Sequence, residues 1–293
     1  MDFTKHNLVC ELSFIPPFHW EALLAFFASH ATAGVETISH GEYSRTVALS
    51  GTHGWFTAAL TDSRSSLRIE ASPSLSPVFP LLLSHIQQLF DLSADPTVIT
   101  AALGSLAKGY PGLRIPGGFD PFELTVRAIL GQQISVKAAT TVAGRFSAAF
   151  GKPAAPPIPG LTYYFPDAAT VAALTVDQVA SLGIIASRTR TIIGVAQAVA
   201  SGDLSLKPGS DPIETMARMR AIPGIGEWTA QYVAMRALGW ADAFPHTDLI
   251  LCRALGEKNP KGVLALADQW RPWRAYAALH LWANYNSSLG AKL

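Results

Sequence analysis

Positions that alternate between apolar and polar residues occur mainly in the first third of the chain. Alternation with a period of two is the pattern of a strand whose successive side chains point to opposite faces. It predicts strands over residues 8–14, 43–49 and 67–71. Apolar residues spaced three and four apart predict helices over residues 20–30 and 80–92. Residues 1–95 are therefore expected to form an α+β domain, an antiparallel sheet flanked by helices.

From Pro96 onward the apolar spacing is helical almost throughout. Besides a helix pair near residue 220, the predicted helices cover residues 97–106, 121–150, 175–182, 187–201, 248–255 and 273–284. Prolines within residues 151–160 predict a rigid surface loop. The pattern as a whole predicts a mainly α protein with an N-terminal α+β domain.

The helix pair near residue 220 carries clear boundary signals. Asp211 is a natural N-cap, Pro212 suits the first helical position, and Glu214 completes a capping box with Asp211. The first helix then runs to a short turn at residues 223–226, which leads directly into the second helix. The sequence therefore predicts a helix–hairpin–helix.

The hairpin turn contains two glycines, Gly224 and Gly226. Glycine adopts left-handed turns without a Cβ clash, and the free N–H groups that begin the next helix form a site for an anion such as a DNA phosphate. An ordinary αα-hairpin with a glycine C-cap and a core stripe of Trp228, Tyr232 and Met235 would leave the same residues. The turn alone leaves both interpretations open.

Composition and charge narrow the class of protein. Hydrophobic residues make up 49% of the 293 positions and charged residues 15%, which excludes a disordered chain and allows two or three domains. The net charge of +1 is unevenly distributed. Residues 1–110 hold five Lys and Arg against nine Asp and Glu, whereas residues 111–293 hold seventeen against twelve. The half with the hairpin is thus the basic one, as expected for a half that meets phosphate.

The two cysteines, Cys10 and Cys252, cannot make a four-thiolate zinc or iron–sulfur site. We expect both to be reduced in a cytoplasmic protein. No secretory signal is expected, because no basic segment followed by an apolar core opens the chain. The longest charge-free stretch, residues 71–90, is interrupted by prolines, so no membrane span is expected.

Four ordered motifs resemble those of the AlkA-type bacterial 3-methyladenine DNA glycosylases, in the helix–hairpin–helix glycosylase superfamily. The first motif covers residues 119–150 and begins Phe-Asp-Pro-Phe-Glu-Leu-Thr-Val-Arg-Ala-Ile-Leu-Gly-Gln-Gln-Ile-Ser-Val-Lys-Ala-Ala. The second, residues 223–232, reads Pro-Gly-Ile-Gly-Glu-Trp-Thr-Ala-Gln-Tyr. Residues 242–248 read Asp-Ala-Phe-Pro-His-Thr-Asp, and residues 270–282 read Trp-Arg-Pro-Trp-Arg-Ala-Tyr-Ala-Ala-Leu-His-Leu-Trp. Together with residues 89–92 and 111–116, the resemblance spans nearly the whole chain.

The resemblance implies a domain organisation and an activity. The N-terminal α+β domain would cover residues 1–95, one helical subdomain residues 96–120 and 241–293, and the subdomain with the hairpin residues 121–240. The implied enzyme is a monofunctional DNA glycosylase that flips out alkylated bases of the 3-methyladenine and 7-methylguanine type and hydrolyses their glycosidic bond in duplex DNA. We expect it to act as a monomer in base excision repair, in the bacterial cytoplasm on nucleoid DNA.

The resemblance also assigns catalytic and base-binding roles. Asp248 would be the catalytic carboxylate, since an anion beside the sugar stabilises the positive charge that develops there when the base departs. Read from local sequence alone, Asp248 is an N-cap of the helix that follows, and both roles are compatible. Trp228, Tyr232 and Trp282 would stack on the electron-poor base, although a place in the core is the alternative for each. Gln133 would be the wedge that fills the gap in the DNA, or simply a polar residue at a helix turn.

The hairpin residues Gly224, Ile225 and Gly226 would bind DNA phosphate without reading the sequence. The family resemblance adds a structural Na⁺ or K⁺ held by backbone carbonyls of Arg220, Ile222 and Ile225. No cofactor and no catalytic metal are expected to be required.

Water is the expected nucleophile, because relatives that cleave the strand use a lysine of the second hairpin helix. No lysine occurs here between Lys207 and Lys258. Two other functions remain open from the sequence. One is a DNA-binding module without catalysis, and the other is a glycosylase for a deaminated or oxidised purine.

Overall fold

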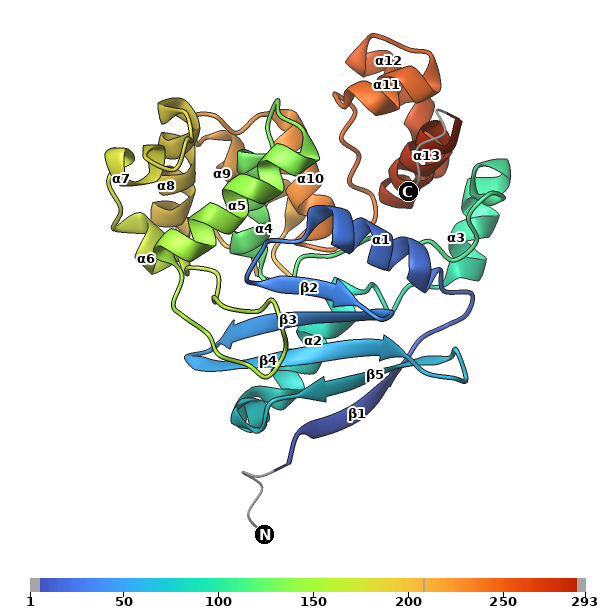
Figure 1. Ribbon diagram of the computed structural model, residues 1–293. Coiled ribbons are helices and arrows are strands. Elements are labelled where there is room, and N and C mark those ends of the chain that lie inside the picture. Colours follow the sequence, from blue (N-terminus) through green and yellow to red (C-terminus); the bar gives the residue numbers. More distant parts are fainter. Residues whose placement is uncertain (1–5, 208, 289–293) are drawn as a thin grey trace.

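The computed structural model describes residues 6–207 and 209–288 (Figure 1). Its first part contains a five-stranded sheet with the strand order β1-β5-β4-β3-β2, in which all neighbours pair antiparallel. The strands are β1 (Leu8–Ser13), β2 (Glu36–Ser39), β3 (Glu42–Leu49), β4 (Thr52–Leu60) and β5 (Ser66–Ala71). The three strands predicted from alternation are β1, β3 and β5, and they are confirmed.

The strands β2 and β4 were not predicted, and the structure shows why. In β4 the neighbouring residues Trp55 and Phe56 are both buried although they point to opposite faces, so no period of two is visible. The strand β2 is only four residues long, which is too short for a recognisable pattern. Apolar residues on both faces thus concealed a strand from the alternation argument.

Two helices pack on the sheet, and one of them also reaches the helical part of the molecule. The helix α1 (Trp20–His30) and the helix α2 (Phe79–Leu89) share a core with the strands. Phe27 of α1 and Phe90 at the end of α2 both contact Tyr43 of β3, with ring centroids 5.0 and 5.4 Å away. Figure 1 shows α1 between the sheet and the helices above it, and α1 contacts α5. This position allows the N-terminal domain to contribute to a site among the helices.

The regular elements of the remaining described chain are all helices, and one continuous cluster of buried apolar side chains joins them. The helices are α3 (Pro96–Leu103), α4 (Pro121–Leu130), α5 (Val136–Phe150), α6 (Ala168–Ala172), α7 (Val176–Ala180), α8 (Ala186–Ser201), α9 (Pro212–Arg220), α10 (Glu227–Arg236), α11 (Leu249–Leu255), α12 (Pro260–Ala267) and α13 (Arg274–Ser288). The short helices α6 and α12 were not predicted. The expected fold class is confirmed, whereas the division into three units stays a prediction.

The prediction of one helix over residues 121–150 is wrong. The chain ends α4 at Leu130 and makes a turn in which Gln133 has a φ of 57°, a left-handed conformation that no α-helix contains. Ser135 then caps α5 by accepting a hydrogen bond from the Ala138 N–H. Gly131 and Ser135 were the local signals for this break.

A buried cluster of charges connects the sheet to α4. Arg45 of β3 pairs with Glu123 of α4 at 2.6 Å, and Arg127 pairs with Glu123 at 3.0 Å and with Glu36 of β2 at 2.9 Å. Burial alone would raise the pKa of Glu36, but the charges of Arg127 and Arg45 prevail and lower it. The cluster therefore holds α4 against the N-terminal sheet.

Candidate active site

The hairpin is formed by α9, a short turn and α10, as predicted. Asp211 caps α9 by accepting a hydrogen bond from the Glu214 N–H at 2.8 Å. The predicted capping box is wrong in its other half, because the Glu214 carboxylate accepts a hydrogen bond from Arg218 at 2.7 Å instead. The Arg218 guanidinium, one helical turn further along α9, thus takes the place of the expected capping-box partner of Glu214.

The two hairpin glycines differ in backbone conformation and in the space around them. Gly224 has a φ of 94°, and a Cβ on it would lie 2.0 Å from Thr191 Oγ1 of α8, so only glycine fits. Gly226 has a φ of −92°, which any residue adopts, and a Cβ there would meet no atom within 4 Å. The expectation of a left-handed turn is therefore right for Gly224 and wrong for Gly226. The open space around Gly226 allows a partner to approach the backbone.

Several polar groups of the turn are already engaged within the protein. The Ile225 N–H donates to the Ile222 carbonyl at 3.1 Å, and Gln132 donates to the Gly224 carbonyl at 3.1 Å. The Arg220 side chain pairs with Glu227 at 2.6 Å. Phosphate binding by Gly224, Ile225 and Gly226 stays a prediction, as does the cation site. The Ile225 amide would have to leave its internal partner to bind a phosphate.

Asp248 stands at the N-terminus of α11, where its carboxylate caps the helix. Its Oδ1 accepts hydrogen bonds from the Ile250 and Leu251 N–H groups at 2.9 and 3.0 Å. The helix-capping interpretation of Asp248 is thereby confirmed. These two bonds fix the direction of the carboxylate relative to the helix.

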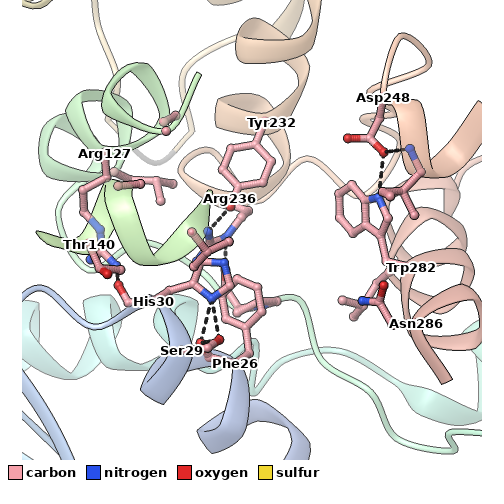
Figure 2. A pocket seen from close by; sticks show the side chains of 18 of the residues that line it. Phe26, Ser29, His30, Arg127, Thr140, Tyr232, Arg236, Asp248, Trp282 and Asn286 are labelled. Carbon is pink, nitrogen blue, oxygen red and sulfur yellow. Dashed lines mark hydrogen bonds between the residues drawn. The ribbon is translucent and has the colours of Figure 1, made fainter. Parts of the chain in front are cut away.

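The Asp248 carboxylate also accepts hydrogen bonds from two indole rings on other helices. Trp228 of α10 donates to Oδ2 at 2.8 Å, and Trp282 of α13 donates to Oδ1 at 3.1 Å. Figure 2 shows Asp248 directly above Trp282. Hydrogen bonds to a charged acceptor are about twice as strong as neutral ones. The three helices α10, α11 and α13 thus hold one carboxylate in a single orientation.

A cavity of about 640 Å³ opens beside this carboxylate. Asp248, Trp228, Tyr232 and Trp282 all line it, so the structure brings together the predicted catalytic and base-stacking residues. The Trp228 and Tyr232 rings are stacked, with centroids 4.8 Å apart and planes inclined by 14°. Gln133 lies outside the cavity lining, on the exposed turn between α4 and α5, and its role as a wedge stays a prediction.

The opposite side of the cavity is built from residues that sequence reasoning missed. Phe26 and His30 of α1 stack on each other, with ring centroids 4.0 Å apart. Arg127 of α4 and Arg236 of α10 lie beside them (Figure 2). The spacing of four from Tyr232 to Arg236 places both on one face of α10 and could have identified Arg236. No local signal connects α1 to this cavity.

This far side of the cavity has an unusual electrostatic environment. Burial, together with the charges of Arg236 and Arg127, lowers the pKa of His30 to about 4, so His30 is neutral near pH 7. Burial also lowers the pKa of the Arg236 guanidinium, which remains charged. A cation thus faces the cavity from the side opposite the Asp248 carboxylate.

The described residues contain no cluster of three or more His, Cys, Asp or Glu side chains that could hold a metal ion. In residues 6–207 and 209–288, no helix is long and apolar enough to cross a membrane.

Comparison with known proteins identifies the family to which this fold belongs. Residues 9–120 match the model of the AlkA N-terminal domain, and residues 126–261 match that of the HhH-GPD superfamily base excision DNA repair proteins. DNA-3-methyladenine glycosylase 2 of Escherichia coli is 34% identical over 92% of this chain and 95% of its own length. A solved structure of 3-methyladenine DNA glycosylase from Archaeoglobus fulgidus superposes with a TM-score of 0.82 at 20% identity, covering 94% of this chain and 98% of that one.

A glycosylase of Clostridium acetobutylicum shares the fold more distantly. The structure of this 8-oxoguanine glycosylase/lyase in complex with double-stranded DNA has a TM-score of 0.70 at 15% identity, covering 98% of this chain and 96% of that one. Fold and site thus define a helix–hairpin–helix protein of base excision repair. The chain belongs to the HhH-GPD superfamily of base excision DNA repair proteins, in the branch that carries an AlkA N-terminal domain. The resemblance seen in the sequence is confirmed.

Proposed function

We propose that the protein is a monofunctional DNA glycosylase that excises alkylated bases from duplex DNA by hydrolysis. The observation that carries the proposal is the Asp248 carboxylate, which two indole N–H groups hold at the wall of an aromatic cavity. The family membership and the 34% identity to an Escherichia coli DNA-3-methyladenine glycosylase support the alkylated base as substrate. The same cavity has room for a purine, which a duplex exposes only after base flipping.

The chemistry follows from the position of the carboxylate. When the bond between C1′ and the base nitrogen breaks, the electron pair leaves with the base and positive charge develops on the sugar. The Asp248 carboxylate stabilises that charge at the moment it forms. A water molecule then bonds to C1′, and its proton passes to Asp248 or to solvent. The stacked Trp228 and Tyr232 rings present the electron-rich faces on which an electron-poor alkylated base stacks.

Water as the nucleophile is supported by the cavity lining, which includes no lysine among the described residues. A glycosylase that also cleaves the strand forms a Schiff base between a lysine and the sugar. We therefore expect no covalent protein–DNA adduct when borohydride is added during turnover. A robust adduct on a denaturing gel would show that an amine of the chain attacks the sugar.

The partner in this proposal is double-stranded DNA. The open backbone around Gly226 and the basic half of the chain support it, as does the DNA complex of the structurally similar Clostridium enzyme. We propose that the protein acts as a monomer in the bacterial cytoplasm. The hairpin would hold the phosphate backbone without reading the base sequence.

The decisive experiment measures free bases released from methylated DNA by chromatography, with wild type beside Asp248→Asn. Asparagine still caps α11, so the variant should remain folded, while excision should fall by about a hundredfold or more because the anion is lost. Asp211→Asn is the matched control, since Asp211 caps α9 outside the cavity and its change should leave excision within about twofold.

The result separates the proposal from its alternatives. Full activity of Asp248→Asn would refute the catalytic role of this residue. A wild-type protein that binds DNA but releases no base would instead indicate a binding module. Release of only deaminated or oxidised purines would indicate a glycosylase for another lesion.

A further inference from the structure

The guanidinium of Arg236 is buried without a carboxylate partner. Its residue is 5% exposed, and its hydrogen bonds go to neutral groups, namely the Pro116 carbonyl, the Tyr232 hydroxyl and, at 3.5 Å, the Gly117 carbonyl. No carboxylate among the residues that the structure describes pairs with it. The neighbouring Arg127, in contrast, is neutralised by Glu36 and Glu123. Burying a charge without a counter-ion costs free energy. Such charges therefore cluster at sites where the charge has a function.

The surroundings of Arg236 strengthen its field in the cavity. The guanidinium carbon lies 4.7 Å from the Phe26 ring centroid and 5.1 Å from the centroid of the Tyr232 ring, whose hydroxyl accepts its hydrogen bond. His30 beside it is neutral and adds no competing charge. Of the five N–H groups of a guanidinium, three are used in the hydrogen bonds above, which leaves two for a partner. A cation buried to this extent acts more strongly than it would in water.

Arg236 and Asp248 lie on opposite sides of the same cavity (Figure 2). A base placed between them would have its sugar bond near the carboxylate and its far edge near the guanidinium. When that bond breaks, the sugar becomes positive, and a neutral base becomes negative because it keeps the electron pair. The two fixed charges therefore match the charge separation of the reaction at both ends.

We propose that Arg236 is a further catalytic residue, which stabilises the negative charge that develops on a departing neutral base. A cationic base such as 7-methylguanine departs as a neutral molecule and needs no such help. A neutral base such as hypoxanthine departs as an anion, whose charge spreads to its ring nitrogens and O6, and it takes a proton from water afterwards. This inference rests on the proposed glycosylase function and assigns a role towards the departing base to a residue of the same site.

The test compares single-turnover excision of hypoxanthine and of 7-methylguanine from otherwise identical duplexes. Arg236→Gln removes the charge, and we expect the ratio of hypoxanthine to 7-methylguanine excision to fall by about tenfold or more. Arg236→Lys keeps the charge, and its ratio should stay within a few-fold of wild type. The 7-methylguanine rate serves as an internal measure of correct folding.

A second pair of variants preserves the hydrogen bonds of Arg236 to Pro116 and Tyr232. His30→Glu places a carboxylate beside the guanidinium and should lower the same ratio, while His30→Gln adds no charge and should not. An equal loss on both substrates in Arg236→Gln, with no change of the ratio in His30→Glu, would mean that Arg236 is only structural.

Wild-type behaviour distinguishes this inference from the proposed function. Release of 7-methylguanine without any release of hypoxanthine would overturn the role of Arg236 alone. Release of neither base would overturn the glycosylase function itself.

Discussion

The two glycines of the hairpin turn should respond in opposite ways to the same substitution. Gly224→Ala places a methyl group 2.0 Å from Thr191 Oγ1 at a φ of 94°, whereas Gly226→Ala places one in open space at a φ of −92°. The first change should therefore affect folding, and the second should affect only the approach of DNA.

The cost of Gly224→Ala follows from two contributions. A left-handed backbone costs an alanine about 1–2 kcal/mol. The methyl group would also displace the Thr191 hydroxyl from the Pro223 carbonyl, to which it donates at 2.8 Å, and losing that hydrogen bond costs about 1 kcal/mol. The sum of about 2–3 kcal/mol corresponds to a fall in melting temperature of roughly 3–5 °C for a chain of this size.

Gly226→Ala should leave the melting temperature nearly unchanged, because no atom lies within 4 Å of the added methyl group. If the Gly226 backbone approaches a phosphate, the methyl group should weaken DNA binding by about tenfold, the value of one charged hydrogen bond. The loss should be equal on all DNA sequences, since phosphate contacts carry no sequence information.

Thermal unfolding and fluorescence anisotropy with several duplexes measure the two effects separately. A destabilised Gly226→Ala or an unaffected Gly224→Ala would refute the structural account of the turn. Gly226→Ala with normal affinity would refute phosphate binding at this residue. A loss confined to one duplex would mean that the hairpin reads bases.

Two further predictions concern buried charges. Burial raises the pKa of Asp91 from 3.8 to about 6, so the folded state disfavours the ionised carboxylate, and stability is lost as the pH rises between these values. Asp91→Asn should therefore raise the free energy of unfolding by up to about 3 kcal/mol at pH 8, and by roughly half of that at pH 5; urea unfolding showing no gain at pH 8 would contradict this. Glu123→Gln leaves Arg45 and Arg127 with one carboxylate fewer and should destabilise the fold by about 3 kcal/mol. The double variant Arg45→Met/Glu123→Leu should recover part of that loss in the same measurement, and a larger loss in the double variant would contradict the charge-pair explanation.

Local sequence predicted those elements in which apolar and polar residue types recur regularly. The strands β1, β3 and β5 and the helix α1 were found from periodicity alone. The strand β4 was missed because the apolar residues Trp55 and Phe56 occupy both of its faces, whereas β3, although also buried on both faces, keeps the polar Ser44 and Thr46 on one of them. The break between α4 and α5 was missed because apolar spacing continues across the turn. Periodicity of residue type therefore gives no signal where apolar side chains occupy both faces, or where a cap interrupts a helix.

The site residues also divide into those that sequence motifs predicted and those that only the structure revealed. The motifs around residues 133, 228, 248 and 282 indicated the family and, through that resemblance, Asp248 together with its aromatic neighbours. Motifs identify these residues because each lies in a conspicuous local pattern, such as a glycine turn or a helix start. The roles assigned to the hairpin amides and to Gln133 stay predictions.

The sequence by itself determined the fold class, the hairpin and the carboxylate proposed for catalysis. Only the tertiary structure decided that two indole rings from different helices hold Asp248, and that Phe26, His30 and Arg236 close the cavity on the other side. The physical reason is that hydrogen bonds and the electric fields of charged groups act between residues that are close in space, whatever their separation in the sequence. Residues more than two hundred positions apart, such as Phe26 and Arg236, meet only when the sheet domain packs its first helix against the helical part. That contact places Phe26 and His30 of α1 beside the Arg236 guanidinium in the cavity.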